Sequence, residues 1–450
     1  MSTDRTALRA AVLVVGVLVA GWIGLVLGAG PAAAHASLVS SSPAQGEVVA
    51  TAPERATFTF DDPVQLPAGG VQVFDAHGKA LESAARTRGG LLIVELPDEM
   101  SDGTYVVTWR VVSDDGHPLA GTLTFSVGHP SPLATSTAGA PAQAPTSVTV
   151  IVAVLQALRY LGTFAALGLA FFAAVLLPAA GGQASDVRQR LRRPLTAGAV
   201  LAAVGAVLLL PVTALDQQGR GWDALLLRAT LLDPLGRVDG AAAGLLVLGL
   251  AALVMATRRG LWSLALVGGG LAVISFALVG HTRSAQPTAL VVAADLAHVA
   301  AGSVWFGGLI GLVVALRRLS GHPALAAGLL SRFSTAAAWF LGTVVVAGTV
   351  LSWRILQSWS AFVDTSFGRT LLVKLGIFLL VVVTAAINRY KLLPALVEAR
   401  GGTAERHAAQ QVRRVIRVEA VLLVGVLAAT GVLVDRSPEP TATSASSRGS

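Results

Sequence analysis

The stretch "GTYVVTWRVVSDDGHPLAGTLTFSV", residues 103–127, decides the fold of the first part of the chain. Apolar and polar residues alternate on both sides of "SDDGHP", and this period of two is typical of half-buried β-strands. Shorter segments of the same kind, "ATFTFDD", "GGVQVFD" and "LLIVEL", precede it and are bounded by turn residues. Several such segments between residues 35 and 128, without a long helical pattern, predict a small all-β sandwich or barrel.

The chain as a whole is too apolar for an ordinary soluble protein. Of the 450 residues, 54% are hydrophobic and 13% are charged, whereas about a quarter of the residues of soluble proteins are charged. A membrane-spanning helix needs about twenty mostly apolar residues. Eight segments meet this length: 148–178, 195–215, 239–257, 261–280, 290–316, 333–352, 369–387 and 415–434. The sequence therefore predicts an α-helical polytopic membrane domain of eight transmembrane helices at residues 148–435.

The basic residues predict the orientation in the plasma membrane. Sixteen Lys and Arg residues fall in the loops expected inside, and eight in the outer loops and the C-terminal tail. This asymmetry places the β domain and both chain ends outside the membrane. It also accounts for the net charge of +8, so the expected partner is the lipid bilayer and not nucleic acid, while the oligomeric state stays open. Residues 221–236 are too short and too charged to span, which predicts an interfacial or re-entrant segment.

Residues 1–34 have the pattern of a secretory signal peptide. Basic residues precede an apolar run that ends in small residues, and cleavage is expected after Ala34. Cleavage would make His35 the first residue, whose α-amine and imidazole Nδ1 could chelate a metal ion. An uncleaved anchor would leave His35 as an ordinary residue next to the membrane. Residues 129–147 are expected to form a flexible linker and residues 436–450 a disordered extracytoplasmic tail.

Any metal site must use nitrogen and oxygen ligands, because the chain has no cysteine and three methionines. Asp115 and His117 are two residues apart and would project to the same side of an extended segment. With His35 they offer two or three nitrogens and one oxygen, a set that suits tetragonal Cu(II). Alternatively, "DDGHP" is merely a turn. The two further histidines of this region, His77 and His129, are expected in solvated turns.

Two groups of motifs resemble known copper-resistance proteins. "AHASLVSSSPAQGEVV" with "VVSDDGHPLAGTLTFSV" resembles the CopC domain. The eight-span remainder, with "ADLAHVAAGSVWFGGL", "TSFGRTLLVKLG" and "INRYKLLPAL", resembles its membrane partner CopD, fused as in YcnJ-like proteins. The resemblance implies an immunoglobulin-like β domain that binds Cu(II) through His35, Asp115 and His117. Some CopC proteins carry a methionine-rich Cu(I) site, and the lack of a methionine run predicts none here.

The fifth predicted span carries titratable residues within the membrane. Asp295, His298, Gly302 and Trp305 recur at helical spacing and share one face. His298 lies about 12 Å along the helix from its outer end, counted from Leu290 at 1.5 Å per residue. A titratable side chain at that depth is costly and is a functional candidate by default. Asp295 and His298 are therefore candidates for a copper path, or alternatively a structural pair that satisfies itself across one turn.

Further residues of the membrane domain have weaker assignments. His281, at the end of the fourth span, is an entry ligand for copper or simply an interfacial residue. Trp305, Gly307 and Gly308 are expected to gate the path or to pack the helices. Three other titratable residues are expected to be paired or to extend toward a membrane surface, because each lies within a few turns of a span end: Arg159, Lys374 and Glu419.

Three functions are compatible with these features. The first is a copper importer or tolerance protein, which is not ATP-driven because no phosphate-binding loop motif occurs. The second is a copper-dependent oxidative enzyme of the histidine-brace type, against which the Asp115 carboxylate counts because it would occupy the position that oxygen needs. The third is a membrane-anchored copper sensor or storage protein, against which a buried Asp295 and His298 count. We therefore expect a copper-binding transport protein without enzymatic activity, whose copper oxidation state in the membrane and direction of flux stay open.

Overall fold

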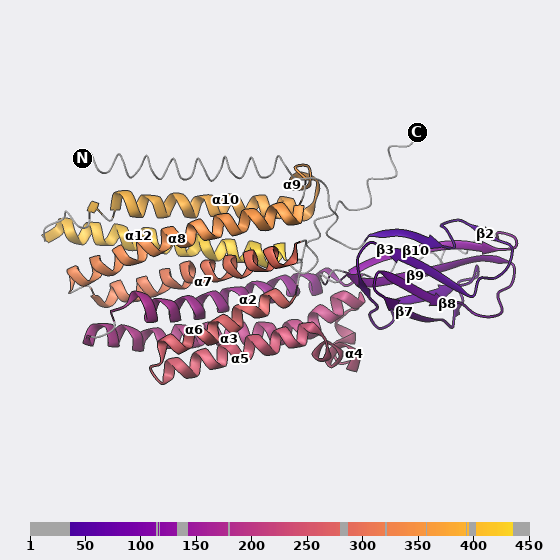
Figure 1. The fold of residues 1–450 in the computed structure, drawn as a ribbon, viewed down its shortest axis with the longest axis horizontal. Coiled ribbons are helices and arrows are strands. Elements are labelled where there is room, and N and C mark those ends of the chain that lie inside the picture. Colours follow the sequence, from indigo (N-terminus) through magenta and orange to yellow (C-terminus); the bar gives the residue numbers. More distant parts are fainter. Residues whose placement is uncertain are drawn as a thin grey trace.

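A computed structural model of the chain forms two parts, a β domain and a helical bundle (Figure 1). The described residues are 37–113, 116, 118–132, 143–178, 181–279, 287–319, 322–356, 358–392, 394–395 and 402–434. The predicted signal peptide, most of the predicted linker and the predicted tail lie outside these ranges.

The β domain is a sandwich of two sheets, which confirms the prediction of an all-β fold. One sheet has the order β1-β3-β8-β7, and the other has the order β2-β10-β9-β5-β6, with β4 also paired to β9. The strands are β1 Leu38–Ser42, β2 Val48–Val49, β3 Arg55–Phe60, β4 Val64–Gln65, β5 Val71–Phe74, β6 Ala80–Leu81, β7 Ala84–Arg88, β8 Leu91–Glu95, β9 Gly103–Ser113 and β10 Pro118–Val127.

Aromatic side chains fill the space between the two sheets. Trp109 of β9 lies with its ring centre 5.8 Å from that of Phe58 and 5.3 Å from that of Phe60, both on β3. Gly121 on β10 pairs with Trp109, and a Cβ atom at position 121 would lie 2.5 Å from the indole ring. The glycine therefore leaves room for the tryptophan on the long hairpin of β9 and β10.

The bundle contains helices at all eight predicted positions, and the helix at the fourth position is the shortest of them among the described residues. Among the described residues, seven helices are long and apolar enough to cross a membrane, and Trp262–Leu278 is a shorter apolar helix. The main helices are α2 Thr146–Phe171, α3 Gly182–Gln218, α5 Val238–Arg258, α6 Trp262–Ile274, α7 Thr288–Arg318, α8 Pro323–Leu356, α10 Ser366–Ile387 and α12 Gly402–Leu433. The prediction of eight transmembrane helices is therefore approximate: seven described helices reach spanning length, and α6 with its terminal 3₁₀ turn η4 (Ser275–Leu278) is a shorter apolar element.

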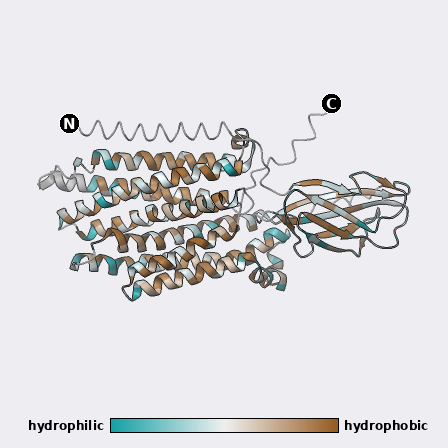
Figure 2. Cartoon of the chain, viewed as in Figure 1, coloured by the Kyte–Doolittle hydropathy of each residue, from teal (hydrophilic) through white to brown (hydrophobic). Residues whose placement is uncertain are grey.

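Small residues bring α2 close to its neighbours. A Cβ atom on Gly168 of α2 would lie 2.0 Å from the carbonyl oxygen of Ser303 on α7, and one on Gly162 would lie 2.4 Å from that of Gly198 on α3. Close approach of helix backbones at small residues is typical of membrane bundles. Figure 2 colours most of the length of the helices as hydrophobic, and large apolar residues are exposed on them, such as Leu248, Leu264 and Val373.

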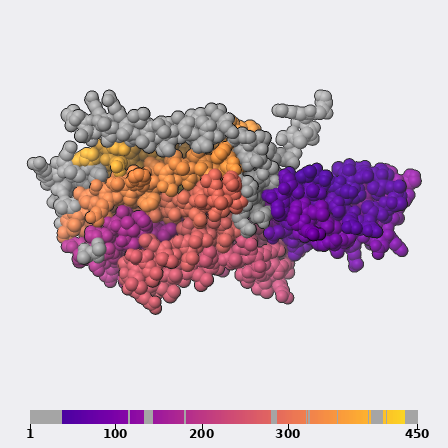
Figure 3. Space-filling view, in the orientation of Figure 1, coloured from indigo at the N-terminus to yellow at the C-terminus, as the bar shows by residue number. Residues whose placement is uncertain are grey.

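The β domain lies at the end of the bundle where α2 begins and α3 ends, and it forms a separate lobe in Figure 3. We refer to this end of the bundle as the β-domain end and to the opposite end as the far end. The predicted non-spanning segment lies at the β-domain end as three short helical turns: η2 Trp222–Ala224, α4 Arg228–Leu231 and η3 Asp233–Gly236. Its leucines are exposed, including Leu226 with 83% of its surface accessible. The segment is thus too short to span, as predicted.

Candidate functional site

The three predicted copper ligands of the β domain, His35, Asp115 and His117, lie outside the described residues. Within the described part of the chain, no group of three or more His, Cys, Asp and Glu side chains could hold a metal ion. The structure therefore bears on the copper site through the neighbours of the three residues.

Those neighbours converge at one end of the sandwich. Ser37 donates from its backbone nitrogen to Oδ1 of Asp61 at 2.5 Å and from its hydroxyl to Oδ2 at 2.7 Å. Three residues beyond Asp61, Val64 pairs with Ser113 at the end of β9. The backbone nitrogen of Gly116 in turn donates to the carbonyl of Ser113 at 2.9 Å. The residues next to His35 and those next to Asp115 and His117 thus lie at the same end of the sandwich, linked through residues 61–64, although they are far apart in the sequence. We refer to this part of the domain as the Gly116 end.

The other two histidines of the region lie in exposed turns, as predicted. The backbone nitrogen of His77 donates to Oδ1 of Asp75 at 2.9 Å, in a turn that Gly78 completes with a φ of 82°. His129 contacts the Asp102 carboxylate through Nδ1 at 3.1 Å. In the strand register both lie toward the Gly103 end of β9, away from the Gly116 end. Each makes a local contact with an aspartate.

In the bundle, the backbone of a neighbouring helix orients His298. Its Nδ1 lies 3.2 Å from the carbonyl oxygen of Val344 on α8. Because a carbonyl can only accept, Nδ1 is the protonated nitrogen of the neutral ring and Nε2 keeps its lone pair. Gly348, one turn along α8, makes this approach possible, since a Cβ atom there would lie 3.2 Å from Cε1 of the ring.

Asp295 lies one turn from His298 on α7, and the structure shows no hydrogen bond between these two described side chains. The pair that satisfies itself across one turn is therefore not the arrangement found. Instead, the ammonium group of Lys374 on α10 acts on both Asp295 and His298 electrostatically. All three side chains are half-buried. A carboxylate, an imidazole and an ammonium group from α7 and α10 thus share one location within the membrane domain.

A second polar contact lies two turns further along α7. Trp305 donates from Nε1 to Oε1 of Glu419 on α12 at 2.9 Å, and the two residues are each 2% exposed. The ring of Phe378 on α10 packs edge-on against the indole at 6.0 Å. No cation pairs with Glu419 among the described residues. The sequence marked Glu419 as paired or extended toward a surface, but it could not show that Trp305 is the partner.

Gly307 and Gly308 lie at helix contacts. A Cβ atom on Gly307 would lie 2.5 Å from Cα of Gly168 on α2, and one on Gly308 would lie 2.6 Å from the ring of Phe333 on α8. Both positions therefore serve the packing of α7 between these two helices. His281 lies outside the described residues.

Arg159 is the other buried charge of the bundle. It is 7% exposed, and its guanidinium carbon lies 4.7 Å from the ring centre of Phe276 and 5.6 Å from that of Tyr160. Its Nε has no hydrogen-bond partner among the described residues. The aromatic faces stabilise the cation in place of a direct ion pair. Because Phe276 belongs to η4, Arg159 also lies beside the end of the short helix α6.

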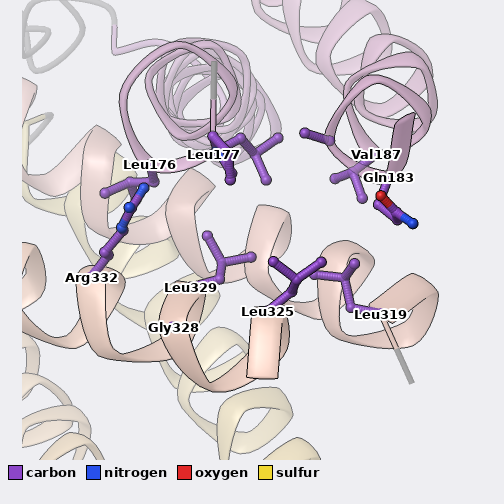
Figure 4. A pocket seen from close by; sticks show the side chains of 11 residues that line it. Leu176, Leu177, Gln183, Val187, Leu319, Leu325, Gly328, Leu329 and Arg332 are labelled. Carbon is purple, nitrogen blue, oxygen red and sulfur yellow. The ribbon is translucent and has the colours of Figure 1, made fainter. Parts of the chain in front are cut away.

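A pocket of about 120 Å³ lies at the far end of the bundle, between the ends of α2 and α7 and the starts of α3 and α8. Figure 4 shows leucine side chains from facing helices pointing into it, with Arg332 beside Leu176 and Gln183 beside Val187. None of the lining residues is a histidine or a carboxylate. The pocket therefore offers no ligand set for a metal ion.

Three regions of the chain match known families. Residues 38–128 match the CopC domain, residues 146–287 match the copper resistance protein D-like N-terminal domain, and residues 327–433 match copper resistance protein D. The chain belongs to the CopC–CopD family. This CopC–CopD protein is 26% identical to copper transport protein CutJ of Bacillus subtilis (strain 168) over 372 residues. The aligned region covers 79% of this chain and 68% of CutJ.

Shorter relatives match the CopC part. Protein YobA of Escherichia coli (strain K12) is 36% identical over 98 residues, which cover 21% of this chain and 79% of YobA. The crystal structure of CopC from Methylosinus trichosporium OB3b is 33% identical, covers 21% of this chain and 95% of that chain, and has a TM-score of 0.20. The CopC–CopD protein thus has a copper-related function at a membrane. Residues 288–326, which include α7, fall between the two CopD matches. The family matches therefore do not cover Asp295 and His298, and any role for them has to be argued from their geometry.

Proposed function

We propose that this CopC–CopD protein captures Cu(II) outside the membrane with its β domain and passes copper across the membrane along α7. The transfer serves copper import or copper homeostasis and is driven by gradients and not by ATP. The name of one relative supports copper transport as the function, since CutJ is a copper transport protein. The predicted inner loops hold sixteen Lys and Arg residues, against eight in the outer loops and the C-terminal tail, and this asymmetry supports an extracytoplasmic β domain.

The orientation of His298 carries the proposal. Metal-binding histidines typically donate their second ring N–H to a carbonyl or carboxylate, which fixes the tautomer and the ring direction. His298 has this arrangement, with Nδ1 bound to the Val344 carbonyl at 3.2 Å and Nε2 available as a ligand. Asp295, one turn away on the same helix, adds an oxygen ligand.

In the β domain, His35, Asp115 and His117 are proposed as the capturing ligands. Their described neighbours Ser37, Ser113 and Gly116 lie at the same end of the sandwich, which supports a site that brings the three ligands together there. Two imidazoles, an α-amine and a carboxylate form a ligand set that binds Cu(II) more tightly than other divalent ions of the first transition row. The β domain would therefore concentrate copper at the entrance of the bundle.

Lys374 lowers the affinity of the site in the bundle for a metal ion, as a transport site requires. Its ammonium group balances the charge of Asp295 when no metal is present, so the carboxylate is not left uncompensated in an apolar setting. An entering cation must compete with this ammonium group. Conduction requires that a site bind strongly enough for entry and weakly enough for release, and a competing internal cation lowers the affinity in this way.

Uptake of copper by vesicles that contain the protein tests the proposal. His298→Ala should abolish uptake, since it removes the nitrogen ligand, whereas Asp295→Asn should reduce uptake less because it keeps the shape of the side chain. His322→Ala is the matched control, because His322 is exposed at the far end and contacts Gln183. Wild-type uptake by well-folded His298→Ala protein would refute the path along α7 and leave the bundle as an anchor.

A further inference from the structure

The Gly116 end of the β domain contacts the bundle directly. Gln217, near the end of α3, donates from Nε2 to the carbonyl oxygen of Gly116 at 3.3 Å. Arg110 of β9 donates from Nη1 to the carbonyl oxygen of Asp216 at 3.4 Å. Gln217 and Arg110 are each 8% exposed, so the contact excludes water from both side chains. The β domain is therefore in direct contact with α3, in addition to its covalent connection to α2.

The end of α3 is itself held in place. Thr149, in the first turn of α2, donates to Oδ1 of Asp216 at 3.1 Å. Trp222, just beyond α3, donates from Nε1 to the Ser147 hydroxyl at 3.0 Å. Asp216, Gln217 and Trp222 are thus held against the start of α2. We refer to these three residues at the β-domain end as the α3 platform.

Arg110 shows that the seating is specific. Burial lowers the pKa of its guanidinium group, and the nearby Asp216 carboxylate raises that pKa in part. A buried guanidinium is costly unless it is compensated, and here the compensation comes from the other domain. Separation of the domains would expose Arg110 to water and leave Gln217 without its acceptor, so the two contacts define one preferred orientation.

The contact touches the chain between two of the proposed copper ligands. Gly116 lies between Asp115 and His117, and its carbonyl is the acceptor for Gln217. We propose that the α3 platform holds the Gly116 end of the β domain on the bundle, so that copper passes from one domain to the other without release into solution. This inference depends on the proposed transport function and adds the route between the two sites.

The electrostatics of the platform favour a cation at this position. The carbonyl end of a helix carries a partial negative charge of about half a unit, and α3 ends at Gly219 with its carbonyl end toward the β domain. The Asp216 carboxylate is balanced by the Arg110 guanidinium beside it, so the partial negative charge of the helix end is what remains to attract copper that leaves the β domain.

The alternative is a β domain that moves on its linker and delivers copper by local diffusion. A short flexible linker gives an effective concentration of about millimolar, which a soluble chelator can exceed. A seated domain excludes the chelator, whatever its concentration. The response to a chelator therefore distinguishes the two routes.

The test uses the full-length protein in vesicles, loaded with one equivalent of Cu(II) and chased with increasing nitrilotriacetate outside. Wild type and Gln218→Ala should deliver the same fraction of copper at every chelator concentration. Gln218 is the matched control, since it is the adjacent glutamine and its side-chain oxygen has no partner among the described residues. The double variant Arg110→Gln/Gln217→Ala should bind Cu(II) normally but lose delivery at least tenfold under chelator. Equal sensitivity of all three proteins, with uptake intact, would overturn the direct route and leave the transport proposal standing.

A second measurement reports seating independently of transport. The chain has no cysteine, so spin labels can be attached at Glu54→Cys on the β domain and Asp233→Cys on η3, both of which are exposed. A single narrow distance distribution is expected in the wild-type background and a broad one in the double variant. A broad distribution in both backgrounds would also overturn the proposal.

Discussion

Gly348→Ala tests the orientation of His298 without touching a proposed ligand. The added Cβ atom would lie 3.2 Å from Cε1 and 3.4 Å from Nδ1 of the ring, which is closer than ordinary contact. The ring must move by a few tenths of an ångström, away from the Val344 carbonyl that Nδ1 now contacts at 3.2 Å. The hydrogen bond that fixes the tautomer is thereby weakened or lost.

The expected loss follows from the role of that hydrogen bond. A neutral hydrogen bond of this kind contributes about 0.5–1.5 kcal/mol to stability. Loss of the group that orients a metal-binding histidine typically lowers metal affinity about 10- to 100-fold. We therefore expect copper uptake at limiting copper to fall by about tenfold, while saturating copper restores most of the rate.

Gly342→Ala is the control for this substitution. Gly342 lies on the same helix α8, and a Cβ atom there would have no neighbour within 4 Å. Both variants gain the same helix propensity, about 1 kcal/mol at most for glycine to alanine. The difference between them in vesicle uptake therefore isolates the contact with His298. Equal uptake by the two variants would refute the role of the ring orientation.

Two further predictions concern the other sites. Addition of one residue before His35 in the mature protein should weaken Cu(II) binding severely, because the α-amine moves away from the imidazole; unchanged affinity by titration would exclude the terminal chelate. Trp305→Phe should destabilise the bundle by about 1–3 kcal/mol, since the Glu419 carboxylate loses its donor in an apolar core, whereas the control Trp339→Phe, at an exposed position, should not. Thermal unfolding in detergent measures both, and recovery by a second change, Glu419→Leu, is expected because an apolar pair leaves nothing unsatisfied.

The β domain was predictable because its periodicity is local. Alternation along residues 103–127 is sufficient to predict the β9–β10 hairpin, whose register runs from Pro118 opposite Val112 to Val127 opposite Gly103. The positions of the eight apolar helices were predictable for the same reason. The length of α6 was not, since the apolar run 261–280 continues past Leu278, where the 3₁₀ turn η4 ends.

The surroundings of His298 could not be predicted, because helical periodicity shows which residues share a face but not which helix lies opposite. Asp295 and His298 follow from spacing on α7 alone. Val344 and Gly348 of α8 carry no distinguishing pattern in the sequence. Lys374 of α10 and Glu419 of α12 were singled out as titratable, but not as neighbours of Asp295 and of Trp305, which is 114 residues from Glu419. Contacts between distant helices required the structure.

The burial of the helices adds a physical reason to place transport at α7. In the most apolar window of α7, 72% of the residues are buried, compared with 11% in those of α8 and α10. The helix that carries Asp295 and His298 is thus the more deeply buried one, whereas α8 and α10, which supply Val344 and Lys374, are more exposed in these windows. Displacement of α8 or α10 costs less free energy than displacement of α7, because fewer packed side chains must separate. Under the proposed transport function, a site between one deeply buried helix and two more exposed ones would open toward either side of the membrane with less unpacking of the core than a site between three deeply buried helices.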